Sequence, residues 1–253
     1  MKGRAVARSD PASTARVDLV VALRWAERFG FAEGICNHFS LALPGSPDRY
    51  LINPQGLHWS ELTPSDLVVV DRDGNRLSGK HRVEPTAFFI HGAVHRANPR
   101  ARCVLHTHMP YATALTVVQG GRLEWASQNA LKFYQRVAYD DEYNGLALDE
   151  AEGNRIASRL GDADVLFLGN HGVIVTGPNV ACAFDDLYYL ERACMLQVLA
   201  AGTGKALRVL PDEIAAHTRA QMDAEREQSH LHLAALRRIL DREQPGWGKP
   251  RGK

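Results

Sequence analysis

The sequence of 253 residues has little of several features that mark specialised classes of protein. Its four cysteines, Cys36, Cys103, Cys182 and Cys194, form no Cys-x-x-Cys pair, which argues against a disulfide framework and a cysteine-rich zinc site. No apolar run approaches the roughly 20 residues of a membrane-spanning helix. We therefore expect reduced, mostly buried cysteines and a cytoplasmic location.

An excess of charge of either sign is also lacking. Lys and Arg together number 30 and Asp and Glu 29, so the net charge is only +1. The only basic concentration is residues 237–253, which is typical of a solvated helix end and tail, and residues 1–20 lack the apolar centre of a signal peptide. We expect neither a nucleic-acid partner nor a membrane partner.

What is present is the composition of an ordinary globular protein, 45% hydrophobic and 23% charged. We expect one domain over residues 1–253, with flexible ends at about 1–12 and about 244–253. Hydrophobic periodicity and turn residues predict helices within 13–31, 85–99, 110–118, 149–163, 181–201 and 211–243, the last as one or two helices. They predict strands within 37–45, 48–56, 65–79, 102–108 and 164–177, of which 65–79 and 164–177 each hold two. The order favours a central sheet flanked by helices.

The segment CVLHTHMPYATAL at residues 103–115 places His106 and His108 two positions apart at the end of an expected strand. Residues i and i+2 of a strand project from the same face, so both imidazoles are expected on one side. Two neutral imidazoles can share a metal ion. The alternative is an exposed strand end with two incidental histidines, and this segment alone does not decide between them.

A third histidine, His171, lies in the segment LGNHGVIVTG, at a bend between two apolar runs. Gly169 and Gly172 on either side of it permit unusual backbone geometry and close approach. Three imidazoles leave one coordination position open, which is typical of catalytic rather than structural metal sites. The alternative is that His171 is only a hydrogen-bonded turn residue.

Four segments together resemble the class II aldolase/adducin family in order and spacing, over about residues 15–200: NHFSLALPG, INPQGLHWSEL, FFIHGAVHRANPRARCVLHTHMPYATAL and LGNHGVIVTG. The resemblance implies an α/β fold, a three-layer α/β/α sandwich with a mainly antiparallel central sheet. It also implies one divalent ion per subunit, Mn or Zn, held by His106, His108 and His171. A homotetramer with active sites between neighbouring subunits is implied as well.

The chain departs from the sugar-phosphate aldolases of this family next to His91. Those enzymes carry Ser-Ser-Glu one helical turn before the matching histidine, whereas an ungapped alignment places Pro85, Thr86 and Ala87 there. The glutamate that binds the metal and abstracts a proton is thus missing at that register. Glu84 lies three residues earlier and would keep nearly the same helix face, so it is a candidate metal ligand and catalytic residue. The alternative is that Glu84 only places negative charge at a helix N-terminus.

The phosphate-binding residues of the aldolases are also altered. Those enzymes use a Thr-Gly pair and two serines, whereas this chain has Gln-Gly and Pro-Thr. Phosphate binding needs clustered N–H and hydroxyl donors, and proline has none, so a phosphorylated sugar fits poorly. An Asn-His pair replaces the aldolases' Gly-Asn, as in the adducin-like branch. The substrate-binding candidates are Asn37, His38, Gln55, Gly56 and Thr86.

Loss of the aldolase base favours decarboxylation. A retro-aldol cleavage begins with removal of a hydroxyl proton, whereas a departing carboxylate is already ionised and the resulting carbanion needs an acid. Residues 56–71 and 82–96 resemble the branch that decarboxylates hydroxylated aromatic or heteroaromatic dicarboxylates, such as 3-hydroxy-2-methylpyridine-4,5-dicarboxylate. The resemblance implies a metal-dependent lyase for a small carboxylated substrate. The alternatives are an aldolase for a phosphorylated or non-phosphorylated hydroxy-carbonyl compound and a non-catalytic adducin-like structural module.

The acid and the substrate-carboxylate partner are open. Besides Glu84 and His171, Tyr111 is a catalytic candidate because it follows the His-x-His motif closely. Further candidate proton donors are Tyr134, Tyr139, His217 and His230, and candidate carboxylate partners are Arg82 and Arg136. Each of these residue types is more often structural than catalytic.

Overall fold

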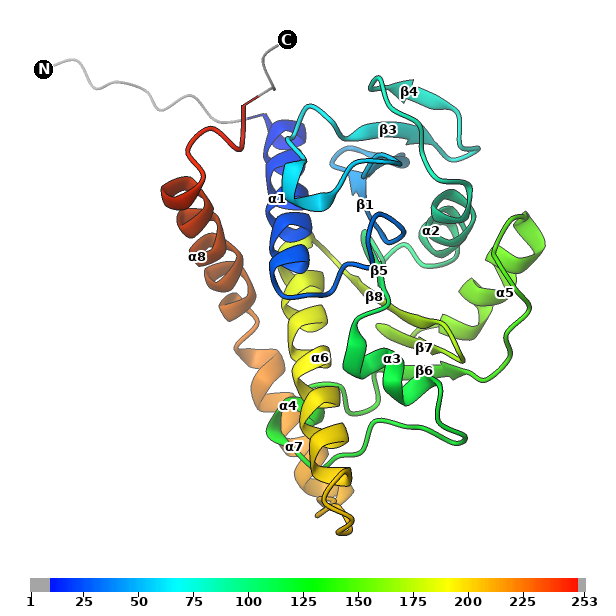
Figure 1. Ribbon diagram of the computed structural model, residues 1–253, viewed down its shortest axis with the longest axis vertical. Helices are drawn as coiled ribbons and strands as arrows, with labels where there is room; N and C mark the ends of the chain where they lie inside the picture. Colours follow the sequence, from blue (N-terminus) through cyan, green and yellow to red (C-terminus); the bar gives the residue numbers. More distant parts are fainter. Residues whose placement is uncertain (1–9, 250–253) are drawn as a thin grey trace, which may run out of the picture.

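A central eight-stranded sheet carries helices on both faces in the computed structural model, which describes residues 10–249 (Figure 1). The strand order is β4-β3-β2-β1-β5-β8-β7-β6. Every neighbouring pair is antiparallel except β6 and β7, which are parallel. The predicted three-layer α/β/α fold with a mainly antiparallel sheet is confirmed.

The elements alternate along the chain much as the hydrophobic patterns predict. The strands are β1 (His38–Leu43), β2 (Ser46–Ile52), β3 (Val68–Asp71), β4 (Arg76–Ser78), β5 (Cys103–Thr107), β6 (Val137–Asp140), β7 (Val165–Leu168) and β8 (Gly172–Gly177). The helices are α1 (Pro11–Arg28), α2 (Pro85–Ala97), α3 (Pro110–Thr116), α4 (Gln128–Leu131), α5 (Glu150–Leu160), α6 (Val180–Ala201), α7 (Asp212–Ala224) and α8 (Glu227–Glu243), with a 3₁₀ turn at Trp59–Glu61.

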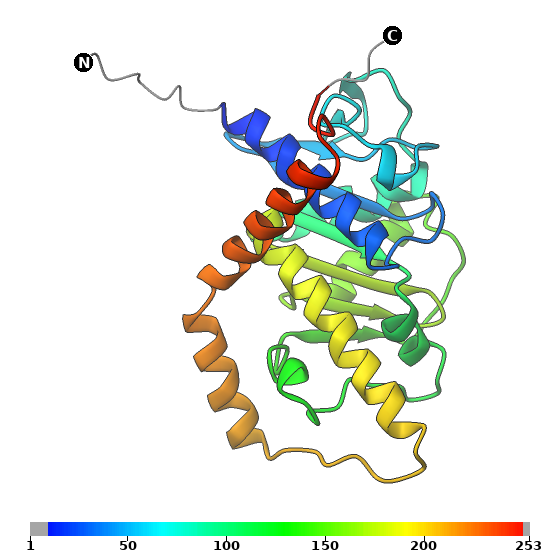
Figure 2. The same cartoon turned by 60° about the vertical axis from the view of Figure 1, so that its left-hand side comes forward.

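Strand alternation assigns each side chain of β5 to one of two cores. Cys103 and Leu105 face the larger core, which includes residues of α1, α6 and α8. Val104 faces the opposite core, beneath α2 and α5. Figure 2 shows α1, α6 and α8 packed together in front of the sheet, and their contacts agree. Because alternate residues share a face, His106 lies on the α2 side with Val104.

The predicted start of the first helix, within 13–31, is two residues late. Helix α1 begins at Pro11 with Asp10 as its cap, because proline suits the first helical position and Asp10 accepts the Ala12 N–H at 3.3 Å. Strand β6 and helix α4 were not predicted. Both have only four residues, too few for a hydrophobic period to show.

The ends of the described chain are partly packed. Within the expected flexible ends, Pro11 is already helical, and Trp247 is buried and donates to Asp241 at 2.8 Å. Residues 1–9 and 250–253, to which the rest of that expectation refers, lie outside the described residues. All four cysteines are free, and Cys36 alone is exposed. None of the helices in residues 10–249 combines the length and hydropathy needed to cross a bilayer.

Candidate metal centre

The three predicted histidines meet at one edge of the sheet. His106 lies near the end of β5, and His108 follows two residues later. Strand β8 is the antiparallel neighbour of β5, so the β7–β8 turn that carries His171 lies beside the end of β5. The ring centroids are 5.0 Å apart for His106 and His108, and 4.8 Å from each of these to His171. One nitrogen from each ring lies within 4.8 Å of the others.

A glycine next to His171 makes this approach possible. A Cβ atom on Gly172 would lie 2.5 Å from the Thr107 carbonyl oxygen and 2.7 Å from the His108 ring. Any side chain there would push the β7–β8 turn away from the end of β5. The close backbone approach that the glycines predict is therefore present at Gly172.

Hydrogen bonds orient two of the rings for coordination. The Nδ1–H of His106 donates to the Val173 carbonyl at 3.0 Å, which leaves Nε2 with a free lone pair. The Nδ1 of His108 contacts the Glu33 carboxylate, again leaving Nε2 free. The two Nε2 atoms are 3.2 Å apart, about the spacing of two ligands on one ion at ~2.1 Å. Nitrogen lone pairs this close repel each other unless a cation or proton lies between them, so the donor set fits a divalent metal.

Burial keeps the rings of His106 and His171 neutral. Burial and the neighbouring His171 and His38 lower the pKa of His106 well below its ordinary value. Burial, followed by the charges of His108 and His38, lowers the pKa of His171 to about 4. Neutral imidazoles are the form that binds metal ions.

Glu33 contacts the triad through His108, which the sequence did not indicate, and its replacement gives a prediction. In Glu33→Gln the neutral amide holds His108 less firmly, and we expect the affinity for Zn²⁺ to fall about 10–100-fold. Isothermal titration calorimetry measures the change. Glu243→Gln, which changes a carboxylate paired with Arg28 elsewhere on the surface, is the matched control and should bind as wild type does. Equal affinities for all three proteins would remove Glu33 from the site.

Glu84 lies outside the cluster of three histidine ligands and instead caps helix α2. Its carboxylate accepts the Ala87 N–H at 3.1 Å and the Thr86 hydroxyl, and it lies 3.3 Å from Nε2 of His38. Burial raises the pKa of Glu84, but hydrogen bonds from His38 and Thr86 outweigh it and lower the pKa to about 2. The structure thus supports the helix-terminus alternative and gives no direct support to Glu84 as a fourth ligand.

His38 connects the triad to a buried polar cluster under α2. It pairs with His106 across β1 and β5, and their rings stack at 5.0 Å. Its Nδ1 lies 3.1 Å from Nε2 of His91. His91 and His95, one turn apart on α2, both contact the hydroxyl of Ser40, at 2.6 and 2.8 Å. No role for Ser40 or His95 was predicted from the sequence, although His-x-Ser in a strand and His-x-x-x-His in a helix are periodic signals.

These buried histidines predict a pH-dependent stability. Burial and the neighbouring His38 and His95 lower the pKa of His91, and burial lowers the pKa of His95 to about 4. The unfolded chain binds a proton at each below pH ~6.5, whereas the folded chain does not. The free energy of unfolding should therefore fall by about 1.4 kcal/mol per pH unit for each as the pH drops from 6.5 to 5.

Urea unfolding of the metal-free protein at several pH values measures this dependence. His217→Gln, a change of an exposed histidine on α7, should leave the slope unaltered. Constant or rising stability on acidification would show that His91 and His95 are not held neutral.

Two of the substrate-binding candidates, Asn37 and Thr86, lie beside His38 at the same edge. Asn37 is buried, its Oδ1 accepts the Glu33 N–H at 2.9 Å, and its Nδ2 has no hydrogen-bond partner within residues 10–249. Gln55 and Gly56 form an exposed turn, in which Gly56 has φ +84°, and the Gln55 N–H donates to the Arg82 carbonyl at 2.8 Å. Thr86 lies 3.4 Å from Nε2 of His38. The orphan amide of Asn37 is a donor available for a substrate oxygen.

Most of the other candidates have structural contacts. Tyr111 is half-buried against the larger core, and its N–H donates to Glu191. Tyr139 accepts the Leu123 N–H, and Tyr134 packs on Trp125. His217 and His230 are exposed on α7 and α8, which pack on α4 and on α1 and α6, respectively.

Arg136 is not available to a substrate carboxylate, so that prediction is wrong. It is buried and pairs with Asp164 and Asp186, each at 2.6 Å. The fold brings the carboxylates that compensate the charge of Arg136 into contact with it, because Asp186 lies on helix α6. A local sequence pattern cannot show this pairing.

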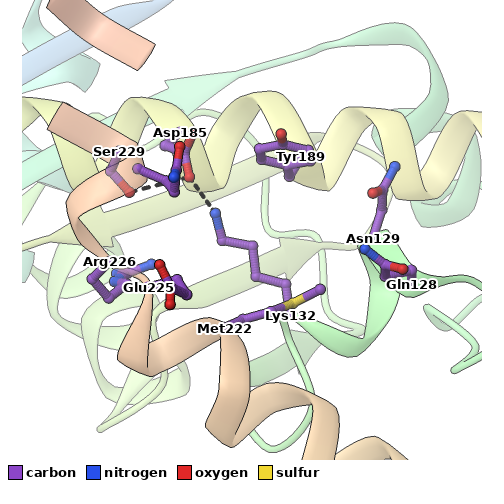
Figure 3. A pocket seen from close by; sticks show the side chains of 10 residues that line it. Gln128, Asn129, Lys132, Asp185, Tyr189, Met222, Glu225, Arg226 and Ser229 are labelled. Carbon is purple, nitrogen blue, oxygen red and sulfur yellow. Dashed lines mark hydrogen bonds and ion pairs between the residues drawn. The ribbon is translucent and has the colours of Figure 1, made fainter. Parts of the chain in front are cut away.

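A separate cavity of about 260 Å³ lies between α4, α6 and the α7–α8 segment (Figure 3). Lys132 points across it to Asp185, lies 4.7 Å from the centre of the Tyr189 ring, and reaches Asp186 at 3.1 Å. Ser229 also donates to Asp185, at 3.1 Å. Because these charges compensate one another, the cavity has the character of a structural ion cluster rather than of a catalytic site.

The fold and the triad together define an α/β protein with a candidate metal centre of three imidazoles. A family model described as the Class II Aldolase and Adducin N-terminal domain matches residues 17–198. The chain belongs to the class II aldolase and adducin family.

Individual relatives agree with this assignment. An aldolase II superfamily protein from Pseudomonas syringae superposes with a TM-score of 0.86, is 35% identical, and is covered over 94% of this chain and 96% of its own. Decarboxylase NovR from Streptomyces niveus is 34% identical over 87% of this chain and 83% of its own. An L-fuculose 1-phosphate aldolase from Glaciozyma antarctica, 24% identical with a TM-score of 0.83 over 96% of each chain, shares the fold.

Proposed function

We propose that this chain is a divalent-metal-dependent carbon–carbon lyase that decarboxylates a small hydroxylated aromatic or heteroaromatic dicarboxylate, such as 3-hydroxy-2-methylpyridine-4,5-dicarboxylate. The observation that carries the proposal is the pairing of an oriented imidazole triad with a carboxylate that is a poor base. His106, His108 and His171 would hold Zn²⁺ or Mn²⁺. Glu84, with a pKa of about 2, is unsuited to remove the hydroxyl proton that aldol cleavage requires. The relationship to decarboxylase NovR supports the same reaction class.

The residues of the site divide the work of such a reaction. A bound divalent ion supplies Lewis-acid stabilisation of negative charge on a substrate oxygen. His106 and His108, which are oriented by Val173 and Glu33, would hold the ion without reorganising. The free Nδ2 of Asn37 offers a hydrogen bond for a substrate oxygen. We assign Gln55, Gly56 and Thr86 as further substrate contacts, and Tyr111 remains a candidate acid.

Product analysis tests the reaction type. Protein loaded with Zn²⁺ or Mn²⁺ is expected to release CO2 from hydroxylated aromatic dicarboxylates and to leave L-fuculose 1-phosphate intact. Cleavage of the sugar phosphate or of a non-phosphorylated hydroxy-carbonyl compound without CO2 release would favour the aldolase. A protein that retains no metal after soaking in either ion, by elemental analysis, would favour the adducin-like structural module.

We also propose that the active protein is a homotetramer in which a neighbouring subunit covers the triad. Large apolar side chains are exposed on the segments that follow α3 and β6: Val117, Val118, Tyr143, Leu146 and Leu148 are each more than half exposed. Two contacts connect this patch to the triad, since the Asn170 N–H donates to the Thr116 carbonyl and the Tyr143 ring lies 6.3 Å from His171. Exposed large apolar residues favour association.

Light scattering after size-exclusion chromatography tests the assembly. Wild type should have the mass of four chains of 28.0 kDa. Leu146→Lys combined with Leu148→Lys should reduce the mass, because lysine ammonium groups would be buried in the interface. A monomeric wild type would contradict the proposal.

A further inference from the structure

His108 lies at the junction between the end of β5 and the start of α3. Within residues 10–249, its ring has one hydrogen-bonding contact outside the triad, with Glu33, whose side chain is 65% exposed. Met109, the N-cap residue of α3, makes no capping hydrogen bond through its side chain. The oxygen that usually accepts the first N–H groups of a helix is therefore lacking at this turn.

A carboxylate from α6 takes the place of this oxygen. Glu191 Oε1 accepts the Tyr111 N–H at 2.8 Å, and Oε2 accepts the Ala112 N–H, also at 2.8 Å. Tyr111 and Ala112 are the second and third residues of α3, whose N–H groups an N-cap side chain normally satisfies. Helices α3 and α6 pack against each other (Figures 1 and 2). Glu191 is thus the cap of α3, although it follows Ala112 by 79 residues.

The burial of this carboxylate is unfavourable. Glu191 is 5% exposed and lies on the same face of α6 as Leu187 and Cys194, which are fully buried. Burial raises the pKa of Glu191, and the two N–H bonds only partly oppose this. No salt bridge joins Glu191 to a cation within residues 10–249. A serine or threonine as the N-cap residue would cap α3 without burying a charge, so capping alone does not explain Glu191.

A cap from another helix also fixes how the two helices lie relative to each other. Bonds to both oxygens of one carboxylate set the distance and the direction of the start of α3 relative to α6. Helix α6 packs on β5 and β8 as well. Strand β5 carries His106, and β8 follows the turn that carries His171. Helix α6 therefore contacts the elements that place all three histidines.

We propose that Glu191 is a positioning residue of the metal centre, which holds the turn from His108 to Tyr111 so that the His108 ring meets those of His106 and His171. The proposal rests on the proposed function only in that these three imidazoles bind the ion. The same two bonds fix the backbone of Tyr111, the candidate acid. The alternative is that Glu191 only stabilises α3.

Glu191→Gln separates these two roles. The variant keeps the shape of the side chain, but its NH2 group faces one of the two backbone N–H groups, so a donor–donor contact replaces one bond. Co²⁺ is a suitable probe, because its visible absorption depends on the arrangement of its ligands. We expect the absorption bands of the Co²⁺-loaded variant to shift, and its affinity for Zn²⁺, measured by calorimetry, to fall about 10–100-fold.

Asp186→Asn is the matched control for a loss of stability alone. Asp186 is another buried carboxylate of α6, and it pairs with Lys132, Arg136 and Arg226. This variant should keep the wild-type Co²⁺ spectrum and a Zn²⁺ affinity within about twofold of wild type. A wild-type spectrum and affinity in Glu191→Gln would overturn the proposal and leave Glu191 with a structural role only.

Activity gives a further readout once a substrate is found. With the metal site saturated, Glu191→Gln should lower kcat about 10–100-fold, because the ligand and the candidate acid are misplaced, and should change KM much less. A rise in KM with unchanged kcat would contradict the positioning role. If no substrate releases CO2, the proposed function fails, and the Co²⁺ spectra and Zn²⁺ affinities still decide whether Glu191 positions the triad.

Hydrogen exchange of the wild-type protein tests the proposal even if Glu191→Gln does not fold. N–H groups at the start of a helix are normally open to water, but those of Tyr111 and Ala112 should exchange slowly. Glu191→Asp, with a side chain shorter by one methylene, cannot reach both N–H groups and should bind Zn²⁺ more weakly than wild type. Fast exchange of both N–H groups, or wild-type affinity in a folded Glu191→Asp protein, would refute the proposal.

Discussion

Replacing His106 by alanine is expected to abolish both metal binding and CO2 release. The ring is oriented by its bond to Val173 and cannot be replaced by another described imidazole, because His38 is committed to His91 and Glu84. We expect the Kd for Zn²⁺ to rise by at least about 100-fold. Loss of several kcal/mol of charge stabilisation corresponds to a fall in kcat/KM of at least about 10³-fold. Calorimetry and CO2 assays measure the two changes.

The control for this experiment is His217→Ala, which removes an exposed imidazole from α7. It should leave both quantities within about twofold of wild type. Far-ultraviolet circular dichroism checks that His106→Ala is folded. Tight Zn²⁺ binding by a folded His106→Ala protein would exclude His106 as a ligand.

Asp186→Asn is expected to cause a large fall in the free energy of unfolding. This carboxylate is fully buried and contacts three cations: Arg136 at 2.6 Å, Arg226 at 2.8 Å and Lys132 at 3.1 Å. Burial raises the pKa of Asp186, but the cations, Arg136 first, outweigh it and lower the pKa to about 2. The amide leaves buried positive charges uncompensated, so the free energy of unfolding should fall by about 3–5 kcal/mol. Urea denaturation at pH 7 measures it.

Asp164→Asn is a matched control because Asp164 pairs with the same Arg136 at the same 2.6 Å. Its side chain is 35% exposed, so water screens the pair and we expect a loss of less than about 1 kcal/mol. Similar losses in both variants would mean that burial does not govern the strength of this cluster.

The layer order and the triad could be predicted because their signals are local. Alternation in β5 places His106 and His108 on one face, and the glycines around His171 mark a turn that approaches another backbone closely. The short elements β6 and α4 carry no such periodicity, and Asp10 caps α1 only because proline follows it.

Residues that act through tertiary contacts were harder to predict. Glu33 lies 75 residues from His108 along the chain, and no spacing relates the two. The pairing of Ser40 with α2 depends on the packing of that helix over β1. From the sequence alone, Arg136 is a candidate partner for a substrate carboxylate. The structure shows that its charge is already compensated, because Asp186 of α6 pairs with it.

The most direct test of the metal centre is an anomalous difference map of crystals grown with Mn²⁺. We expect one peak per subunit, within about 2.0–2.3 Å of a ring nitrogen of each of His106, His108 and His171. Absence of a peak there, or a peak bound by other side chains, would contradict the triad.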